Sequence, residues 1–272
     1  MIRSAKAAPL TARELQRKLR ELANPSDALI LQRFFKTAPG EYGEGDVFLG
    51  IKVPPLRKLA KEAANLPLPE VEHLLRSKTH EERSLALMIL VIQYTRGDAK
   101  TRERVYRFYL RCKIHINNWD LVDGSASYIL GPHFIHRDPA PLRKLVKSPR
   151  LWDRRIAILT TFHFIRAGQF NLIIEFAAAL LADPHDLMHK AIGWMLREVG
   201  KKNVGVLTDF LEQHAAEMPR TMLRYAIERL PAERKKTFLA KRSLQLNKIL
   251  LRRHESHEVR NDLKAKNRSN HR

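Results

Sequence analysis

Apolar positions recur at helical spacing along most of the chain, and a common signature returns at a nearly constant interval. When one position of each signature is aligned, successive anchors are separated by 35, 36, 34 and 35 residues. The anchors are Ala86, Leu121, Ala157, Ala191 and Ala226. A period of this length is typical of stacked helical hairpins, none of which buries its apolar face without its neighbours.

The periodic segments predict helices joined by short turns. Thr11, with Glu14 three residues later, forms a capping box for a helix over residues 11–23. A second short helix is expected over residues 27–35, and from residue 79 onward helices alternate with turns that hold proline, glycine or aspartate. Strand signals are nearly absent, so the predicted fold is an all-α solenoid of about six helical pairs.

Residues 36–55 interrupt the helical pattern with a segment rich in glycine and proline. We predict an ordered loop rather than a linker, because several apolar side chains in the segment need burial. These are Val47, Phe48, Leu49 and Ile51. Pro54 and Pro55 suit the first turn of the helix that follows.

The apolar period fades beyond about residue 242, where cations dominate and aromatic residues are scarce. We therefore expect a repeat domain over residues 1–242 and a basic, partly disordered tail over residues 243–272. A solvated chain end and an auxiliary arm that binds phosphates without specificity are the two interpretations of this tail.

The position two residues before each anchor holds a side chain that is unusual for a helical core. These residues are Ser84, Trp119, Arg155, His189 and Arg224. Because equivalent positions of a solenoid line up along one surface, they predict a basic strip that carries a tryptophan. Function is expected on this strip.

The charge of the chain indicates what the strip binds. The 272 residues carry a formal net charge of +21, and 44% of them are hydrophobic, which suffices for a continuous repeat core. Such an excess of cations favours a polyanionic partner, above all nucleic acid, over the alternatives of an anionic membrane or an acidic protein.

The single cysteine, Cys112, excludes an intramolecular disulfide and argues against a cysteine-built metal site. No metal and no cofactor are expected. The N-terminal residues lack the apolar run of a signal peptide, and no stretch is long enough to span a membrane. We expect a monomer in a reduced, cytoplasmic setting, associated with a bacterial nucleoid.

One carboxylate and two indoles fall on the predicted strip. Trp119 and Asp123 are four residues apart, so they share one face of a helix. Trp194 is flanked by Lys190 and Arg197 at helical spacing. Small residues at positions 124–126 leave room around the carboxylate.

Each of these residues also has a structural interpretation. A tryptophan on a solenoid helix packs between repeats, and Asp123 inside a helix forms a local salt bridge. Asp120, near a helix start, is expected to be a cap. Arg154 or Arg155 pairs with Asp153 or with a neighbouring repeat. The convergence of several unusual residues on equivalent positions favours the functional interpretation.

Four segments resemble the AlkD family of DNA alkylation repair glycosylases, a group of HEAT-like repeat proteins with an armadillo-type fold. The segments are FLGIKVPPLRKLAK (48–61), NNWDLVDGSA (117–126), LWDRRIAIL (151–159) and HKAIGWMLREVGKK (189–202). The resemblance covers about residues 25–240. It implies that Trp119, Asp123 and Trp194 form the catalytic cluster and that Arg155 contacts DNA.

By the same resemblance, duplex DNA lies on the concave face, and the enzyme excises N3- and N7-alkylated purines in base excision repair without enclosing the base in a pocket. Further DNA contacts are expected from four cations of the basic strip. These are Arg154, Lys190, Arg197 and Arg224. The loop at Pro39–Asp46 and the tail depart from the simplest members of the family, and some relatives bind DNA without excising a base.

The expected chemistry follows from the lesion. Alkylation at N3 or N7 places a positive charge on a purine, which then leaves without the protonation that ordinary glycoside hydrolysis requires. Asp123 would stabilise the positive charge developing on the sugar and orient the attacking water, helped by the faces of Trp119 and Trp194. Because no lysine stands out as a Schiff-base nucleophile, a monofunctional hydrolase is predicted.

Two other functions compete with this one. A non-catalytic repeat protein that binds branched or distorted DNA explains the fold and the charge, but a carboxylate facing phosphates does not serve binding. A scaffold for acidic proteins leaves the grouping of indoles and carboxylate unexplained.

Overall fold

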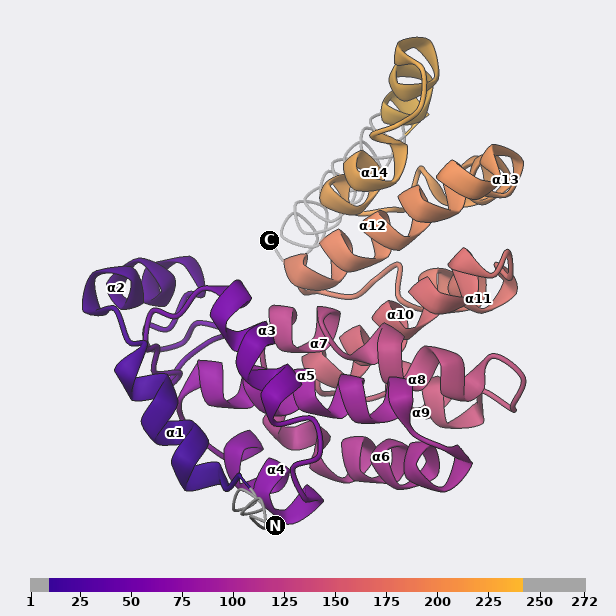
Figure 1. Cartoon of the computed structure of the whole chain (residues 1–272). Coiled ribbons are helices and arrows are strands. Elements are labelled where there is room, and N and C mark those ends of the chain that lie inside the picture. Colours follow the sequence, from indigo (N-terminus) through magenta and orange to yellow (C-terminus); the bar gives the residue numbers. More distant parts are fainter. Residues whose placement is uncertain (1–9, 242–272) are drawn as a thin grey trace, which may run out of the picture. The chain divides into compact units, whose positions relative to one another are not determined.

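The computed structural model of the chain describes residues 10–241, and within that range it is helical without a named strand, which confirms the all-α class (Figure 1). Its α-helices are α1 (Ala12–Glu21), α2 (Pro25–Phe34), α3 (Val53–Glu62), α4 (Leu68–Leu75), α5 (His80–Arg96), α6 (Ala99–Cys112), α7 (Trp119–Asp123), α8 (Ala126–Phe134), α9 (Ala140–Val146), α10 (Leu151–Arg166), α11 (Asn171–Ala179), α12 (Asp186–Lys202), α13 (Val204–His214) and α14 (Arg220–Ile227). A 3-10 turn, Lys113–His115, precedes α7, and residues 232–241 are also helical.

The chain divides into two compact units, Met1–Ala167 with α1 to α10 and Gly168–Arg272 with α11 to α14. We call them unit 1 and unit 2. The predicted domain boundary at residue 242 stays a prediction, and the predicted tail over residues 243–272 lies outside the described residues. Within residues 10–241, none of the helices has the length and hydrophobicity that crossing a bilayer requires.

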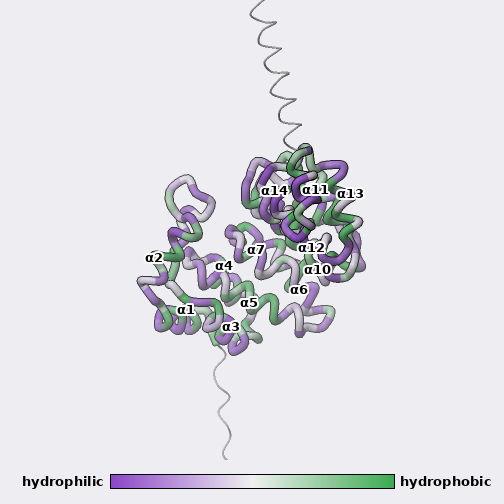
Figure 2. The backbone as a smooth tube through the Cα atoms, turned by 90° about the horizontal axis from the view of Figure 1, so that it is seen from above, coloured by the Kyte–Doolittle hydropathy of each residue, from purple (hydrophilic) through white to green (hydrophobic). Residues whose placement is uncertain are grey.

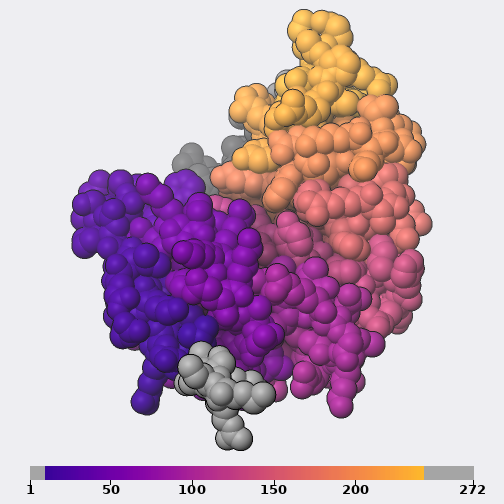
Figure 3. Space-filling view, in the orientation of Figure 1, coloured from indigo at the N-terminus to yellow at the C-terminus, as the bar shows by residue number. Residues whose placement is uncertain are grey.

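The first two helices begin at side-chain caps. The Thr11 hydroxyl accepts from the Glu14 N–H, and the Glu14 carboxylate accepts from the Thr11 N–H, which confirms the capping box. Helix α2 begins at Pro25 rather than at Asp27, because the Asn24 side chain accepts the first free N–H groups and a proline at the first helical position needs no acceptor. In Figure 3 this indigo segment forms a continuous part of the surface of unit 1.

The segment between α2 and α3 is an ordered loop, as predicted, but of its four apolar residues Leu49 is only half-buried and Val47 is exposed. Phe48 and Ile51 are buried, whereas Val47 is 46% exposed. The Val47 N–H donates to the Lys78 carbonyl and the His80 N–H donates to the Val47 carbonyl, so the backbone of Val47 faces the protein. The expectation that Val47 needs burial is therefore wrong, because its backbone pairing turns the side chain outward.

The core of unit 1 forms around α5 and α10. Helix α5 packs on α3, α4 and α6, and α10 packs on α8 and α9. In Figure 2, hydrophobic residues (green) follow one another along α5, while the neighbouring helices alternate between hydrophobic and hydrophilic residues. All five sequence anchors are buried, with exposures of 2% or less. The repeat interval thus marks equivalent buried positions on α5, α7, α10, α12 and α14, as expected of units that bury their apolar faces against neighbours.

In unit 2, α12 packs closely on α14. Gly193 makes this possible, since a Cβ atom there would lie 2.5 Å from both the Met222 carbonyl oxygen and the Tyr225 Cβ. A glycine at this position lets two backbones approach without a void. The close contact fixes the helix that carries Trp194.

Candidate functional site

Trp119 and Asp123 lie at the two ends of α7, one helical turn apart, as their spacing predicts. The helix begins after Asn118, whose side-chain oxygen accepts from the Trp119 N–H at 2.8 Å. It ends at Gly124, whose N–H donates to the Asp120 carbonyl oxygen at 2.9 Å. With both ends of this short helix bonded, the indole and the carboxylate keep a defined register.

Asp123 forms a bidentate ion pair with Arg155 of α10. Arg155 Nε donates to Asp123 Oδ1 at 2.9 Å, and Nη2 donates to Oδ2 at 2.8 Å. The Asp123 side chain is 17% exposed and that of Arg155 is 5% exposed. Parallel donation of this kind fixes the plane as well as the position of a carboxylate. The expected pairing of Arg155 with a neighbouring repeat is confirmed, while its contact with DNA stays a prediction.

Burial and charge act on Asp123 in opposite directions. Desolvation raises the pKa of this carboxyl group above the ordinary value, Arg155 lowers the pKa, and the nearby Asp120 raises it. Desolvation prevails, so the pKa of Asp123 is raised. A carboxylate with this little hydration interacts strongly with any positive charge that develops beside it.

The Trp119 ring is half-buried and packs on the residues at the end of α2. It stacks on Phe35, with ring centroids 5.1 Å apart and an angle of 11° between the planes. Phe34, which is 62% exposed, meets the indole edge-on at 5.9 Å. The packing interpretation of Trp119 is therefore correct for the face that Phe35 covers.

Asp120 is not a helix cap, because Asn118 takes that place. Asp120 Oδ2 lies 2.7 Å from His80 Nε2, and His80 Nδ1 lies 3.2 Å from Asp46 Oδ2. Asp46 also accepts from Asn118 Nδ2 at 3.1 Å and pairs with Arg83 at 2.7 Å. The sequence analysis missed His80, Asp46 and Arg83. The available signal was the run HEER at positions 80–83, directly before the apolar residues of the same helix.

Arg154 braces the start of α10. Its Nη1 donates to the carbonyl oxygens of Ser148 and Pro149 at 3.1 and 2.8 Å. These bonds satisfy carbonyl groups of the turn before the helix. The predicted contact of Arg154 with DNA stays a prediction.

Trp194 lies in unit 2, on α12, and is half-buried. Its Nε1 donates to Glu198 Oε1 at 3.1 Å, one helical turn further on. Lys201 Nζ lies 2.7 Å from the same carboxylate oxygen. These bonds fix the indole relative to its own helix, and its convergence with Trp119 and Asp123 stays a prediction.

The other predicted DNA-binding cations also lie in unit 2. Lys190 pairs with Asp186 at 2.8 Å on the surface of α12, and Arg197 pairs with Glu228. Arg224 on α14 is exposed. The Lys190–Asp186 pair is exposed and therefore weak, so a phosphate competes with its carboxylate at little cost, whereas the Arg197 side chain is only 19% exposed.

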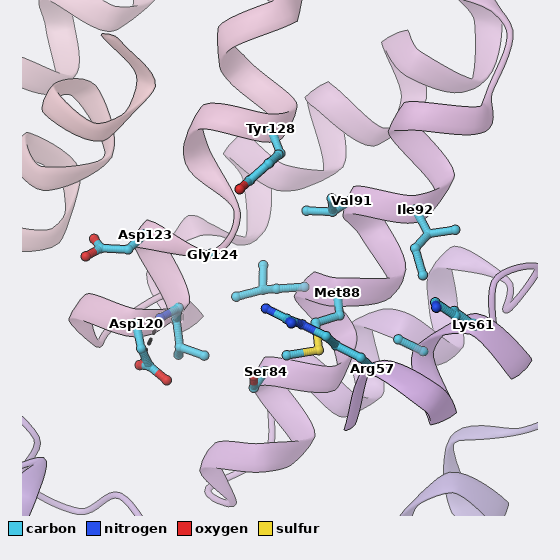
Figure 4. Close-up of a pocket in the computed structure, with 13 residues that line it drawn as sticks. Arg57, Lys61, Ser84, Met88, Val91, Ile92, Asp120, Asp123, Gly124 and Tyr128 are labelled. Atoms are coloured by element: carbon cyan, nitrogen blue, oxygen red, sulfur yellow. Dashed lines mark hydrogen bonds between the residues drawn. The ribbon is translucent and has the colours of Figure 1, made fainter. Parts of the chain in front are cut away.

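A cavity of about 340 Å³ adjoins Asp123 within unit 1 (Figure 4). Apolar side chains of α5 form its floor, Arg57 and Lys61 of α3 stand on one side, and Asp120 and Asp123 stand on the other. Figure 4 shows the Arg57 side chain extending toward the middle of this space. In the part of the chain that the structure describes, no three His, Cys, Asp or Glu side chains are grouped to hold a metal ion.

Comparisons with known proteins bear on the family and the fold of the chain. The family model described as DNA alkylation repair enzyme matches residues 15–230. A solved structure described as a predicted DNA alkylation repair enzyme from Enterococcus faecalis is similar in fold, with a TM-score of 0.60 and 18% sequence identity over 77% of this chain and 97% of that chain. No curated protein matches the chain significantly.

Proposed function

Because the chain belongs to the DNA alkylation repair enzyme family, we propose that it is a DNA glycosylase for purines made cationic by alkylation at N3 or N7. The family match supports a role in DNA alkylation repair, and the repeat interval supports HEAT-like repeats as the scaffold. The observation that carries the proposal is the Asp123 carboxylate, oriented by Arg155 and one helical turn from the Trp119 indole.

The reaction requires only one carboxylate. The bond between C1′ of the deoxyribose and the purine nitrogen breaks, and its electron pair neutralises the positive base as it leaves. Positive charge then develops on the sugar, where Asp123 stabilises it. A water molecule adds to C1′, and Asp123 accepts its proton and releases it to solvent. No lysine attacks the sugar, so the strand stays uncut.

Arg155 has a positioning role in this scheme. Its two hydrogen bonds hold both oxygens of Asp123, and burial of the Arg155 side chain keeps this geometry rigid. We retain the predicted phosphate contact of Arg155 as a second role, because a phosphate beside the pair would set the register of the lesion.

The two indoles add to the electrostatic stabilisation. The face of an indole carries negative charge density and attracts a cation placed over it. Trp119 is held by Phe35 and Trp194 by Glu198, so neither ring has to be ordered during the reaction. Duplex DNA is the proposed partner, bound through phosphates by Arg154, Lys190, Arg197 and Arg224.

The test is base release from duplex DNA that contains N7-methylguanine, measured in single turnover at saturating enzyme. Asp123→Asn keeps the shape of the side chain and removes its charge, so the rate should fall by roughly 10²–10³ while DNA binding is kept. Asp138→Asn is the matched control, since that side chain is 76% exposed in the same unit, and its rate should equal that of the wild type.

Equal rates for wild type and Asp123→Asn would contradict the mechanism. They would favour the alternative, a non-catalytic protein that binds distorted DNA. The observation that favours this alternative is the ion pair itself, because a buried pair between α7 and α10 also has a purely structural use.

A further inference from the structure

The start of α5 carries four buried charged residues in succession. His80, Glu81, Glu82 and Arg83 are 3%, 2%, 3% and 4% exposed. Burying a charged group is costly unless the group is paired and hydrogen-bonded. Each of the four has such partners, and those of His80 lead to α7.

His80 ties down both residues that flank Trp119. It bonds Asp120 directly through Nε2 at 2.7 Å. Through Nδ1 it meets Asp46, which also accepts from Asn118 at 3.1 Å. A single residue, His80, thus holds the first turn of α7 on either side of the indole, and we call His80 with its partners Asp46 and Asp120 the hub.

The His80 ring also reaches the indole through aromatic packing. It stacks on Phe48 with centroids 4.5 Å apart, and it lies 5.0 Å from Phe35. Phe35 in turn stacks on Trp119. Displacement of the His80 ring therefore affects the indole by two independent routes, one polar and one apolar.

We propose that His80 is a positioning residue, which holds the first turn of α7 and the Trp119 indole in the geometry that base excision requires. Its effect on catalysis rests on the proposed function, whereas its effect on the placement of Trp119 does not. His80 is buried and acts through Asp120 and Phe35.

The charge state of His80 determines how many bonds the hub makes. The groups that face its ring are Asp46 from the loop, Asp120 from α7 and Arg83 from α5. Because both ring nitrogens lie against carboxylate oxygens, only the doubly protonated ring donates to both. Burial lowers the pKa of His80, but the bonds to Asp120 and Asp46 together outweigh burial, so the pKa is raised to about 9.

Deprotonation therefore removes one of the two bonds above about pH 9. The Asp120 side chain is 27% exposed and that of Asp46 is 4% exposed. Since Asp120 can turn toward water and Asp46 cannot, the bond to α7 is the one expected to break. The first turn of α7 then loses its anchor while the loop keeps its own.

The kinetic test compares base release by the wild type and by His80→Gln between pH 7 and pH 10. At pH 7 the variant should be slower by roughly tenfold or more, because small misplacements of catalytic groups have effects of this size. The rate of the wild type divided by that of the variant should fall toward one as the pH rises through about 9, because the wild type then also loses the bond to α7. Taking the ratio cancels any pH dependence of the lesion itself.

The matched control is His133→Gln. His133 is 4% exposed and stacks on Tyr106 at 3.7 Å, and burial lowers its pKa to about 4, so it is neutral across the tested range. Its variant should show a rate ratio to wild type that does not change between pH 7 and pH 10. Asp120→Ala removes the acceptor of the same bond on the α7 side and should reproduce the His80→Gln profile, which covers the case in which His80→Gln does not fold.

A second readout is independent of catalysis. The fluorescence of Trp119, isolated as the difference between wild type and Trp119→Phe, should titrate with a midpoint near pH 9. Asp120→Ala should abolish this titration, because no bond from His80 to the Asp120 side chain is then left to break. A flat fluorescence profile together with a pH-independent rate ratio would overturn the proposal. A fluorescence titration with a midpoint near pH 9, combined with no base release by the wild type, would keep the positioning role of His80 and reject the proposed function.

Discussion

The Asp123 carboxylate has both a structural role and a proposed catalytic role. Its ion pair with Arg155 connects α7 to α10, and desolvation raises its pKa despite that pair. A group held in this way is costly to keep in the folded state but needs no rearrangement when positive charge appears beside it. Structural and catalytic interpretations of the pair are therefore compatible at this residue.

Arg155→Ala should lower the free energy of unfolding by roughly 3–5 kcal/mol, because it leaves a buried carboxylate without its bidentate partner. Urea denaturation measures this loss. The change should also raise the pKa of Asp123 further, since a group that lowers it is removed. In the proposed mechanism Asp123 acts as the carboxylate, so on acidification excision by the variant should be lost at a higher pH than excision by the wild type.

The double variant Arg155→Ala, Asp123→Asn is the control for this prediction. Without a charge at position 123, part of the lost stability should return, which a double-mutant cycle quantifies. An Arg155→Ala protein as stable as the wild type, but with weaker DNA affinity, would mean that Arg155 acts as a phosphate ligand rather than as the partner of Asp123.

At the scale of elements, the loop before α3 is held by the start of α5. Glu81 accepts from the N–H groups of Leu49, Gly50 and Ile51 at distances between 2.8 and 3.2 Å. Gly50 has φ of +81°, and a Cβ atom there would lie 2.1 Å from the Asn24 carbonyl oxygen. Two features therefore hold the segment FLGI in place. The Glu81 carboxylate accepts from its backbone, and Gly50 adopts a conformation that no other residue could take there without strain.

Glu81→Gln should destabilise the protein by roughly 1.5–3 kcal/mol, because an amide has one acceptor oxygen and directs N–H groups at backbone donors. Hydrogen exchange of the amides at positions 49–51 should accelerate in the variant. Glu82→Gln is the matched control, since Glu82 is buried on the same helix but accepts from Gln16. Equal exchange of the loop amides in both variants would show that Glu81 does not anchor the loop.

Helical periodicity predicted elements better than it predicted contacts between them. The capping box at Thr11 and the buried anchors follow from local spacing, which sequence displays directly. The pairing of Arg155 with Asp123 joins residues 32 apart, and spacing alone left its partner open. Asp120 was misjudged because its partner, His80, comes from a different helix, and Val47 because its backbone pairs with residues beyond α4.

At the scale of the whole molecule, the net charge of +21 acts on any polyanion that approaches. This property does not depend on which residues carry out the chemistry. Many of the cations are committed to intramolecular pairs, as Lys190 and Arg197 are. In the proposed complex with duplex DNA, phosphates would replace these carboxylates and counterions would be released from the duplex.

Affinity for duplex DNA should therefore fall steeply with salt, by roughly 10³ or more between 50 and 200 mM if six or more phosphates are neutralised. Arg224→Ala removes an exposed cation of the predicted strip, so it should weaken binding alike for all sequences and reduce the salt slope by about one. Arg107→Ala is the matched control, because this side chain is 77% exposed, pairs with Glu103 on α6 and lies off the strip. Fluorescence anisotropy over a salt series measures both effects. A flat salt dependence, or equal slopes for the two variants, would count against the strip as a phosphate-binding surface, and the flat dependence would favour a scaffold for acidic proteins.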